Sequence, residues 1–399
     1  MKLAIWIDTI SDVREIDGVP WLHTAGTSAQ FMTFALAVAA HFSDATILTR
    51  SAPDGAPLRP VGPLTSGQFV GLPFYPSLRD ARAFLRAAPA TVRRARAAFE
   101  RADVAWLFGP HPLTWPMLSA ARRAGATPVL GVRQPGMSYW WGRAASLREL
   151  LAVPLLAPTE LYLRTRGRKL AMTVVGERIA RLYRRQPQNT LVHVAATVPV
   201  AMATNRSDQH GRAATPSNAA RSWRLLAVGR LEPEKDPLLA LDVLRELKTR
   251  AGRRVTLSWA GDGRLRAAFL GRAEQLGLAA EVQLLGDVEF ARLRSLYQQS
   301  DLLLHTAKVE GIPQVLLEAL SFGLPVVATD AGDIASFFGE HVRVVADRTP
   351  ESLAKAVVAL LRDRQTYAEL AERGRQFAAE HALEPEAQRV AEFLRRARR

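Results

Sequence analysis

Short apolar runs bounded by polar or glycine residues alternate with longer amphipathic stretches along most of the chain. The short runs are typical of buried strands, and the longer stretches, with apolar positions three or four residues apart, are typical of helices. Alternating strands and helices predict an α/β protein with a parallel, doubly wound sheet in each half. The predicted strands are residues 2–8, 45–49, 104–108, 128–132, 171–175, 190–194, 224–228, 255–260, 282–285, 302–304, 326–329 and 342–345.

The predicted helices and loops lie between these strands. Residues 205–222 have no core pattern and predict a linker, which separates an N-terminal domain at 1–204 from a C-terminal domain at 223–380. The tail, residues 381–399, is expected to be helical. The other helices are expected at 28–41, 78–101, 113–123, 147–167, 177–185, 237–250, 264–276, 290–299 and 352–362, with loops at 9–27 and 53–76.

Two carboxylates stand out in residues 302–329, which predict a strand, a loop, a helix, a turn and a strand. Glu310 lies in the loop, and Glu318 lies in the helix among apolar neighbours. Ligands of an open α/β sheet bind at the carboxyl ends of the strands, so Glu310 is placed to accept hydrogen bonds from a hydroxyl-bearing ligand. The alternative for Glu318 is a solvated helix face, but a glutamate among apolar neighbours usually needs a partner.

A second motif begins at Gly229, directly after the predicted strand 224–228. Its cations, Arg230 and Lys235, come just before Asp236–Pro237, a pair that suits the N-cap and first position of a helix. Two cations beside a helix N-terminus, at the carboxyl end of a strand, predict an anion site. The alternative, two solvated surface cations, is weakened by the paired glutamates further along the chain.

Both motifs resemble those of a known family. Glu310-Gly311-Ile312-Pro313 and Glu318-Ala319 match the pattern E-G-x-P-x-x-x-x-E-A, and residues 229–235 match G-R-x-x-x-x-K. The chain thereby resembles the retaining GT-B glycosyltransferases of family 4, closely in the C-terminal half and loosely in the N-terminal half. The resemblance implies two Rossmann-like domains that face each other across a cleft, and a C-terminal helix that packs back toward the N-terminal domain.

The same resemblance implies retaining, metal-independent transfer of a sugar from a nucleotide-sugar, with no cofactor besides this co-substrate. Arg230, Lys235 and Glu310 are the implied catalytic residues: the two cations clamp the diphosphate, and Glu310 holds sugar hydroxyls. Glu318 is the implied ribose ligand. The implied donor-binding set is Gly26, Arg230, Lys235, Gly261, Gly286, Val288, Glu310, Gly311, Ile312, Pro313 and Glu318. The sequence shows no Asp-x-Asp metal signature, so no metal site is predicted.

The N-terminal half departs from the family pattern. It has the single Gly26 where the family has a Gly-Gly loop, and Arg133 where the family commonly has a histidine. Arg133 and His111, each at the end of a predicted strand, are the candidates for contacts with the acceptor or the sugar. The alternative for His111 is a structural histidine.

The net charge of +15 bears on partners rather than on fold. Nucleic acid, an anionic membrane and phosphorylated substrates are the partners that such a charge suits, and no nucleic-acid-binding motif is present. The absence of cysteine excludes disulfides, thiolate metal sites and a cysteine nucleophile. Residues 1–8 do not resemble a signal peptide, which favours the cytoplasm. Basic and aromatic residues interleave at 133–185 and predict peripheral contact with the inner face of the cell membrane.

These expectations describe an enzyme that extends a glycan or a lipid-linked saccharide in cell-surface or extracellular polysaccharide biosynthesis. Two alternatives stay open. One is another sugar-nucleotide enzyme of the same fold, such as an epimerase or a phosphorylase. The other is a non-catalytic protein that binds anionic polymers, although such binding does not require the paired Glu310 and Glu318.

Overall fold

The computed structural model describes residues 1–25, 28–64, 67–78, 80–133, 160–161, 163, 165, 170–183, 187–204 and 222–398. Contacts divide the chain into two compact units, which are described separately. The N-terminal domain is Met1–Thr197 with Leu383–Arg399, and the C-terminal domain is Val198–Ala382. This division differs from the predicted boundary at residue 204 because α8 (Val200–Thr204) packs on helices of the C-terminal domain. Nearly all of the predicted linker lies outside the described residues.

The N-terminal domain contains a sheet whose parallel strands follow the order β5-β3-β1-β6-β7-β8-β9. From β1, the chain first adds β3 and β5 on one side and then adds β6, β7, β8 and β9 on the other side. The direction of strand addition therefore reverses between β1 and β6, as in a doubly wound Rossmann-like sheet. The strands are β1 (Lys2–Ile16), β3 (Asp44–Ser51), β5 (Gly67–Leu72), β6 (Val104–Gly109), β7 (Thr127–Val132), β8 (Ala171–Val175) and β9 (Thr190–His193).

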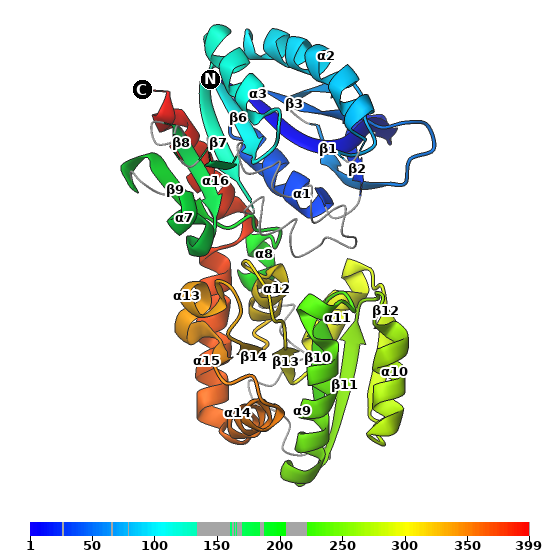
Figure 1. Cartoon of the computed structure of the whole chain (residues 1–399). Helices are drawn as coiled ribbons and strands as arrows, with labels where there is room; N and C mark the ends of the chain where they lie inside the picture. Colours follow the sequence, from blue (N-terminus) through cyan, green and yellow to red (C-terminus); the bar gives the residue numbers. More distant parts are fainter. Residues whose placement is uncertain are drawn as a thin grey trace. The chain divides into compact units, whose positions relative to one another are not determined.

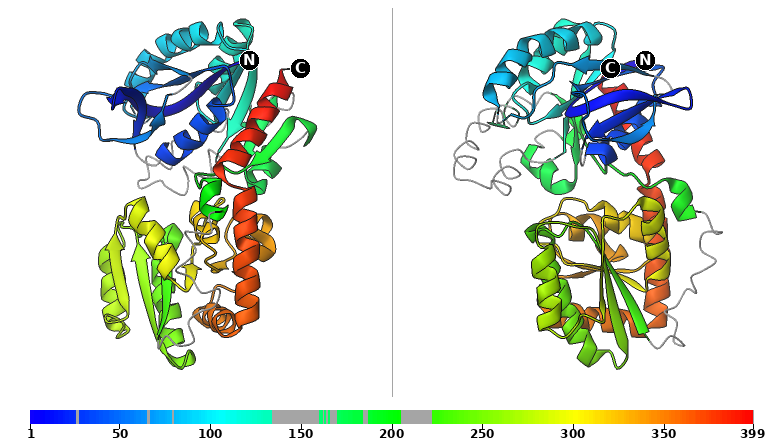
Figure 2. Two further views of the ribbon diagram at one scale, coloured as in Figure 1. Left: turned by 180° about the vertical axis from the view of Figure 1, so that it is seen from behind. Right: turned by 90° about the vertical axis from the view of Figure 1, so that its right-hand side faces the viewer.

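Helices cover both faces of this sheet. They are α1 (Ser28–Ala39), α2 (Ala81–Phe99), α3 (Thr114–Arg123), α7 (Glu177–Tyr183) and α16 (Leu383–Ala397), with a short 3-10 turn, η3 (Pro187–Asn189), before β9. Alternate side chains of β1 point to opposite faces. Leu3 and Ile5 pack with α1 and α16, whereas Ala4 and Trp6 pack with α2, α3 and α7. Figures 1 and 2 show α16, in red, lying against the N-terminal sheet.

One extension of the sheet was not predicted. β1 continues past residue 8 into an antiparallel hairpin with β2 (Val19–Ala25), and β2 pairs with the edge strand β4 (Leu58–Pro63). The expected loops at 9–27 and 53–76 therefore contain strands. The sequence pattern that would predict these strands is weak for two reasons. The outer arm of the hairpin is solvated and carries polar residues, and an edge strand such as β4 tolerates proline, which usually indicates a loop.

The C-terminal domain contains six parallel strands in the order β12-β11-β10-β13-β14-β15. The order reverses between β10 and β13, which is again the Rossmann arrangement. The strands are β10 (Ser222–Val228), β11 (Arg254–Ala260), β12 (Val282–Gly286), β13 (Leu302–His305), β14 (Val326–Thr329) and β15 (Arg343–Val345). Each lies within two residues of a predicted strand.

The helices of this domain are α9 (Pro237–Arg250), α10 (Arg266–Gln275), α11 (Phe290–Gln299), α12 (Gln314–Ser321), α13 (Ile334–Phe338), α14 (Pro350–Arg362) and α15 (Arg364–Glu380), with 3-10 turns η5 (Pro233–Lys235) and η6 (Gly339–His341). Trp223, Leu225 and Ala227 of β10 form one continuous core with α9, α10 and α14. Among the described residues, none of the helices has the length and apolar character that crossing a bilayer requires.

Candidate active site

The candidate site lies where the strand order of the C-terminal sheet reverses, between β10 and β13. The turn η5 follows β10, and the loop that carries Glu310 follows β13. The two segments are hydrogen-bonded, because the backbone N–H of Lys308 donates to the carbonyl oxygen of Glu234 over 2.8 Å. This reversal point is where open α/β sheets bind their ligands. The two sequence motifs are thus brought together as expected of a shared site.

Lys235 and Glu310 form a direct ion pair at this point. The Lys235 ammonium donates to Oε1 of Glu310, and Nε2 of His305 lies 3.1 Å from the same oxygen. The Glu310 side chain is only 9% exposed and that of His305 only 4%. Since Oε1 serves both partners, Oε2 of Glu310 is the oxygen best placed to accept from a ligand.

Glu310 is held as a carboxylate. Burial alone would raise its pKa, but the hydrogen bond to His305 and the Lys235 ammonium outweigh burial and lower the pKa to about 2. Glu310 therefore accepts hydrogen bonds and does not donate a proton at neutral pH. A fixed carboxylate of this kind suits sugar hydroxyls.

The turn that presents Lys235 is fixed from several sides. The Thr306 hydroxyl donates to the carbonyl oxygens of Lys235 and Asp236, over 3.1 and 3.0 Å. Asp236 was expected to cap α9, but its side chain makes no capping hydrogen bond. The Asp236 backbone adopts the left-handed conformation (φ 48°). Instead of capping α9, the side chain forms ion pairs through Oδ2, with Arg348 Nη2 at 2.9 Å and Lys308 Nζ at 3.1 Å. Left-handed backbone at a non-glycine residue costs free energy and is frequent at functional sites.

Arg230 lies at the more open side of the motif. Its side chain is 46% exposed and pairs with Glu234 Oε1 at 2.7 Å. The guanidinium has five donors, so this pair leaves donors for a second anion. Arg230 follows β10, and Lys235 is the last residue of the turn η5. An anion site at these two cations stays a prediction.

Glu318 is buried rather than solvated. Its side chain lies on α12, the residue is 5% exposed, and Oε2 accepts a hydrogen bond from the Tyr297 hydroxyl over 2.7 Å. Burial raises the pKa of Glu318, and the hydrogen bond from Tyr297 partly offsets that effect. Tyr297 comes from α11, and its ring stacks on Phe322. The expectation that Glu318 needs a partner is confirmed.

The glycines of the predicted donor site join neighbouring loops. The backbone N–H of Gly261 donates to the carbonyl oxygen of Gly286 over 2.7 Å, and a Cβ on Gly261 would overlap the carbonyl oxygen of Gly229. The loops after β10, β11 and β12 therefore meet at Gly261. Gly261 thus approaches protein backbone closely, whereas a Cβ added to Gly286 would meet no atom within 4 Å. Val288 is half-buried and precedes α11.

The residues between the two glutamates form the entry to α12. Gly311 is exposed, Ile312 is half-buried and Pro313 is buried. Pro313 occupies the extended N-cap position, one residue before the helix rather than in its first turn. The carbonyl oxygen of Gly311 accepts from the Asp333 backbone N–H over 3.3 Å, which ties this entry to the loop after β14. For this entry to α12, and for the loops that carry Gly261, Gly286 and Val288, contacts with a sugar donor stay predictions.

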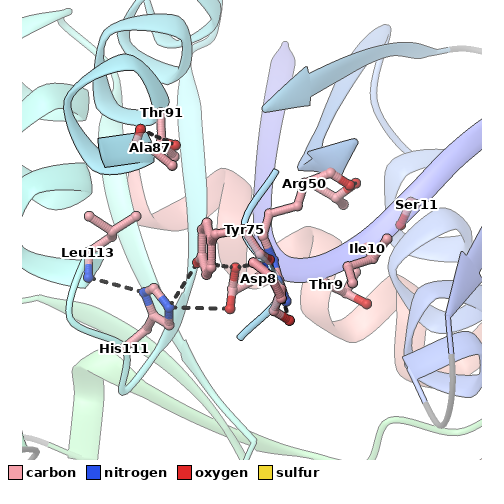
Figure 3. Close-up of polar contacts among 12 residues, drawn as sticks. Asp8, Thr9, Ile10, Ser11, Arg50, Tyr75, Ala87, Thr91, His111 and Leu113 are labelled. Carbon is pink, nitrogen blue, oxygen red and sulfur yellow. Dashed lines mark hydrogen bonds and ion pairs between the residues drawn. The ribbon is translucent and has the colours of Figure 1, made fainter. Parts of the chain in front are cut away.

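In the N-terminal domain, the two described candidates are already engaged. The Arg133 guanidinium lies 4.0 Å over the ring of Phe31. His111 is buried, its Nδ1 accepts from the backbone N–H of Leu113 over 3.1 Å, and its Nε2 lies 3.2 Å from Oδ2 of Asp8 (Figure 3). Both ring nitrogens of His111 are thus directed at protein groups. The structural alternative describes this histidine better than ligand contact does. Gly26 lies outside the described residues.

Sequence reasoning missed three residues of the C-terminal site: His305, Thr306 and Tyr297. His305 and Thr306 follow the apolar run of β13 at its carboxyl end, and this position could have identified them as site residues. Tyr297 lay within a predicted helix, where its position did not indicate a role in the site. Among the described residues, no group of three or more histidine and acidic side chains is arranged to hold a metal ion.

Comparison with known families gives one match to a family model. Residues 214–377, about two fifths of the chain, match glycosyl transferases group 1. The match includes both motifs and all the described residues of the candidate active site. The C-terminal domain is therefore similar to glycosyl transferases group 1 over nearly all of its length.

Curated relatives match over similar segments. The D-inositol 3-phosphate glycosyltransferase 2 of Catenulispora acidiphila is 32% identical over 168 residues, which is 40% of this chain and 38% of that protein. The GPI3 subunit of the phosphatidylinositol N-acetylglucosaminyltransferase of Saccharomyces cerevisiae is 30% identical over 128 residues, 32% of this chain and 28% of that protein. The chain thus matches well under half the length of these relatives.

Solved structures match over nearly the whole chain. HepE of Anabaena, in complex with UDP, has a TM-score of 0.66 at 16% identity, covering 99% of this chain and 100% of that chain. WaaG, a glycosyltransferase involved in lipopolysaccharide biosynthesis, has a TM-score of 0.64 at 19% identity, covering 98% and 99%. At such identities the likeness shows the fold. The predicted GT-B fold of two Rossmann-like domains is confirmed.

Proposed function

We propose that the protein is a retaining glycosyltransferase of family 4, which moves a sugar from a nucleotide-sugar to a glycan or lipid-linked saccharide. The observation that carries the proposal is the Lys235–Glu310 pair at the strand reversal of the C-terminal sheet. This pair supports the proposal because a cation suits a diphosphate, an ionised carboxylate suits sugar hydroxyls, and both residues lie within the segment that matches glycosyl transferases group 1. HepE, a structural neighbour, was solved with UDP-glucose.

The proposed chemistry uses charges that the site already holds. The bond between the sugar C1 and the diphosphate oxygen breaks, and the diphosphate takes the electron pair. Arg230 and the remaining donors of the Lys235 ammonium stabilise its charge. The acceptor oxygen attacks C1 on the same face and gives its proton to the departing phosphate oxygen, so the configuration is retained. Removal of one preorganised donor of this kind costs about 10²–10³ in rate in well-studied enzymes.

Glu318 completes the donor site in this proposal. Its carboxylate lies on α12, the helix that begins just after the Glu310 loop, and Tyr297 fixes one of its oxygens. The other oxygen accepts from the ribose hydroxyls. The proposal involves no metal, because two cations neutralise the leaving group.

A nucleotide-sugar panel tests the donor assignment. UDP-glucose, UDP-N-acetylglucosamine, GDP-mannose, UDP and GDP are added to the purified protein with EDTA, and the thermal unfolding midpoint is measured. A ligand at 100 times its Kd adds about 2.7 kcal/mol of stability, a shift of several degrees. One nucleotide series should stabilise the wild type, and it should stabilise a Lys235→Ala variant much less. Equal shifts in both proteins would contradict the assignment.

The stereochemical outcome is tested without an acceptor. Slow hydrolysis of an α-configured nucleotide-sugar is followed by proton NMR before the free sugar mutarotates. The α-anomer should appear first, whereas the β-anomer would contradict retention. Conversion of the donor into an epimeric nucleotide-sugar would instead favour the epimerase alternative.

We also propose that the protein works in the cytoplasm, in peripheral contact with anionic lipid, and takes part in cell-surface or extracellular polysaccharide biosynthesis. Most of the basic and aromatic stretch at 133–185 lies outside the described residues. The support comes from α2, whose exposed face carries Arg82, Arg86, Arg93, Arg94 and Arg96. Each cation near an anionic bilayer contributes about 1 kcal/mol. Flotation with anionic vesicles at low salt, and its loss at high salt, is the expected result; no flotation at low salt would contradict it.

A further inference from the structure

Asp236 has a backbone conformation that its place in the chain does not require. Among the described residues, the non-glycine residues with positive φ are Asp17, at 52°, and Asp236, at 48°. Asp17 and Gly18 form the two-residue turn between β1 and β2, and such hairpin turns need positive φ. Asp236 lies between the turn η5 and α9, outside any hairpin. Its left-handed conformation therefore depends on contacts that hold it.

Two residues at other strand ends supply these contacts. Thr306 follows β13, and its hydroxyl donates to the carbonyl oxygens of Lys235 and Asp236 over 3.1 and 3.0 Å. Arg348 follows β15, and its Nη2 donates to Oδ2 of Asp236 over 2.9 Å and to the carbonyl oxygen of Thr306 over 3.3 Å. Arg348 thus contacts both the side chain at the turn and the residue that holds the backbone of the turn. Because β15 is the edge strand, these contacts join the turn after β10 to the edge of the sheet.

The loop that carries Arg348 is itself fixed. Oδ2 of Asp347 accepts from the hydroxyls of Thr349 and Ser352, over 3.1 and 2.8 Å. The Thr349 hydroxyl oxygen accepts from the backbone N–H of Ser352 over 3.2 Å, which caps α14. Both chain neighbours of Arg348 are therefore tied to the first turn of α14. A fixed backbone reduces the conformational entropy that is lost when the long Arg348 side chain is held in one place.

Stability gives no evident reason for an arginine at this position. Arg348 Nε is buried and has no hydrogen-bond partner among the described residues. A buried N–H without a partner opposes folding, so a smaller apolar side chain would avoid this effect. The contacts that the guanidinium gains in return are those with Asp236 and Thr306. The arginine is thus best explained by what it does to the turn.

Arg348 also affects the charge of the turn. Asp236 is next to Lys235, and an unpaired carboxylate at that place would repel a diphosphate. Oδ2 of Asp236 pairs with Arg348 at 2.9 Å and with Lys308 Nζ at 3.1 Å. The Lys308 side chain is 50% exposed and that of Arg348 is 32% exposed, so solvent screens the Arg348 pair less. Arg348 is therefore the principal counterion of Asp236.

The conformation of the turn determines where the Lys235 side chain lies. Lys235 directly precedes Asp236, and its stem folds back over the end of β10, because a Cβ added to Gly229 would be 3.6 Å from its Cγ and Cδ. The ammonium then reaches Oε1 of Glu310. A change of φ at Asp236 would rotate the turn relative to α9 and move the ammonium away from Glu310.

We propose that Arg348 is a positioning residue of the donor site, which acts through Asp236 and the left-handed turn to hold Lys235 against Glu310. Arg348 itself does not touch the ligand. The proposal rests on the proposed function for the nature of the ligand, a nucleotide diphosphate. The link from Arg348 to Lys235 needs no ligand and can be measured by itself.

Nucleotide affinity tests the effect on the ligand. Calorimetry uses UDP or GDP, whichever stabilises the wild type. Arg348→Ala should weaken binding about fivefold or more, because the turn must then be ordered when the ligand binds. Glycine adopts the left-handed conformation without support and carries no charge, so Arg348→Ala combined with Asp236→Gly should bind about threefold or more tightly than Arg348→Ala alone. A role of Arg348 in general stability would not produce this rescue.

Arg362→Ala is the matched control for this measurement. Arg362 lies on α14 in the same domain, and its Nη2 also donates to two carbonyl oxygens, those of Arg250 and Ala251. These two residues are at the opposite end of α9 from Asp236. Arg362→Ala should therefore bind the nucleotide as the wild type does.

A double-mutant cycle tests the link to Lys235 without ligand. Urea unfolding midpoints give the stability lost in Lys235→Ala, first in the wild type and then in the Arg348→Ala background. The loss should be at least halved in that background, because Lys235 is then no longer held against Glu310. Equal losses in the two backgrounds would show that Arg348 does not position Lys235.

If Arg348→Ala does not fold, Arg348→Lys takes its place in both measurements. Lysine keeps the charge but not the guanidinium geometry, so the same effects are expected at smaller size. Wild-type affinity in the folded Arg348 variant, or no rescue by Asp236→Gly, overturns the proposal. If neither nucleotide binds to the wild type while the stability cycle shows coupling, the transferase is contradicted and the positioning of Lys235 by Arg348 is kept.

Discussion

The Lys235 ammonium donates to Oε1 of Glu310, a residue 75 positions further along the chain. This single pair joins the two sequence motifs across the strand reversal of the C-terminal sheet. It also gives each partner a second task. Lys235, together with His305, keeps Glu310 ionised, and Glu310 holds the Lys235 side chain beside the turn that is expected to face the diphosphate.

Removal of either partner should impair transfer without unfolding the protein. We expect Lys235→Ala and Glu310→Ala each to lower turnover at least about tenfold, which corresponds to about 1.4 kcal/mol of barrier. Lys248→Ala is a matched control, because Lys248 lies on α9 in the same domain and pairs with a different carboxylate, Glu281. Turnover is measured as nucleotide release from the donor that stabilises the wild type. Wild-type turnover in a folded Glu310→Ala variant would contradict the assignment.

Gly332 is expected to hold the Glu310 loop in place. It has a φ of 64°, and a Cβ there would overlap the carbonyl oxygen of Glu310. Gly252 has a similar φ of 66°, but a Cβ there would meet no atom. Both alanine substitutions carry the backbone cost of about 1 kcal/mol, and only Gly332→Ala should also lower turnover. Equal turnover in the two variants would show that the loop position is unimportant.

Tyr297→Phe should weaken nucleotide binding through Glu318. The substitution removes the hydrogen bond that lowers the raised pKa of Glu318, so protonation of this buried carboxyl becomes easier. A hydrogen bond to a charged group contributes about 1.5–3 kcal/mol, and we expect a loss of affinity of about tenfold or more. The loss should be greater at pH 6 than at pH 8, because protonation removes an acceptor.

The control for this variant is Tyr367→Phe. The buried hydroxyl of Tyr367 donates to the backbone carbonyl oxygen of Asp301 over 2.9 Å. Its loss should lower stability similarly and leave nucleotide affinity unchanged. Calorimetry with the stabilising nucleotide measures both variants. If Tyr297→Phe and Tyr367→Phe bound the nucleotide with the same affinity, Tyr297 would not position Glu318 for the ligand.

The pKa of Glu310 predicts a pH-dependent stability. Because its folded pKa is about 2 and its ordinary pKa is 4.5, the stabilisation is present above pH 4.5 and disappears as the pH falls toward 2. The shift corresponds to roughly 3 kcal/mol at most. Glu310→Gln should therefore lose less stability between pH 5 and pH 3 than the wild type, as measured by urea unfolding midpoints. Glu340→Gln, at a side chain that is 74% exposed, should follow the wild type.

Much of the fold was predictable because its strands are buried on both faces. β10 and β13 contain continuous apolar runs, at 225–228 and 302–304, that no solvated element would carry, and the predicted bounds of β10, β11 and β13 differ from the observed ones by at most two residues. The hairpin of β1 and β2 escaped prediction because its outer arm is solvated. The helix α15 was not expected either, although Tyr367 and Leu370 on its buried face have helical spacing.

The candidate site was predictable to the extent that its residues occupy fixed places after strands. Arg230, Lys235 and Glu310 could be placed from the strand ends alone. Tyr297 could not, because its contact with Glu318 depends on how α11 packs beside α12. The role of His111 was also beyond the sequence, since its partner Asp8 lies on a different strand and is aimed by a bulge.

The return of α16 to the N-terminal sheet affects how the chain can acquire its structure during synthesis. α1 and α16 share one core on one face of that sheet, and α16 follows the whole C-terminal domain in sequence. The N-terminal domain is therefore completed only after the contiguous segment from Val198 to Ala382 has been synthesised. Until α16 emerges, a nascent N-terminal domain must keep an apolar face uncovered, so we expect this face to be the part of the domain most prone to aggregation during synthesis.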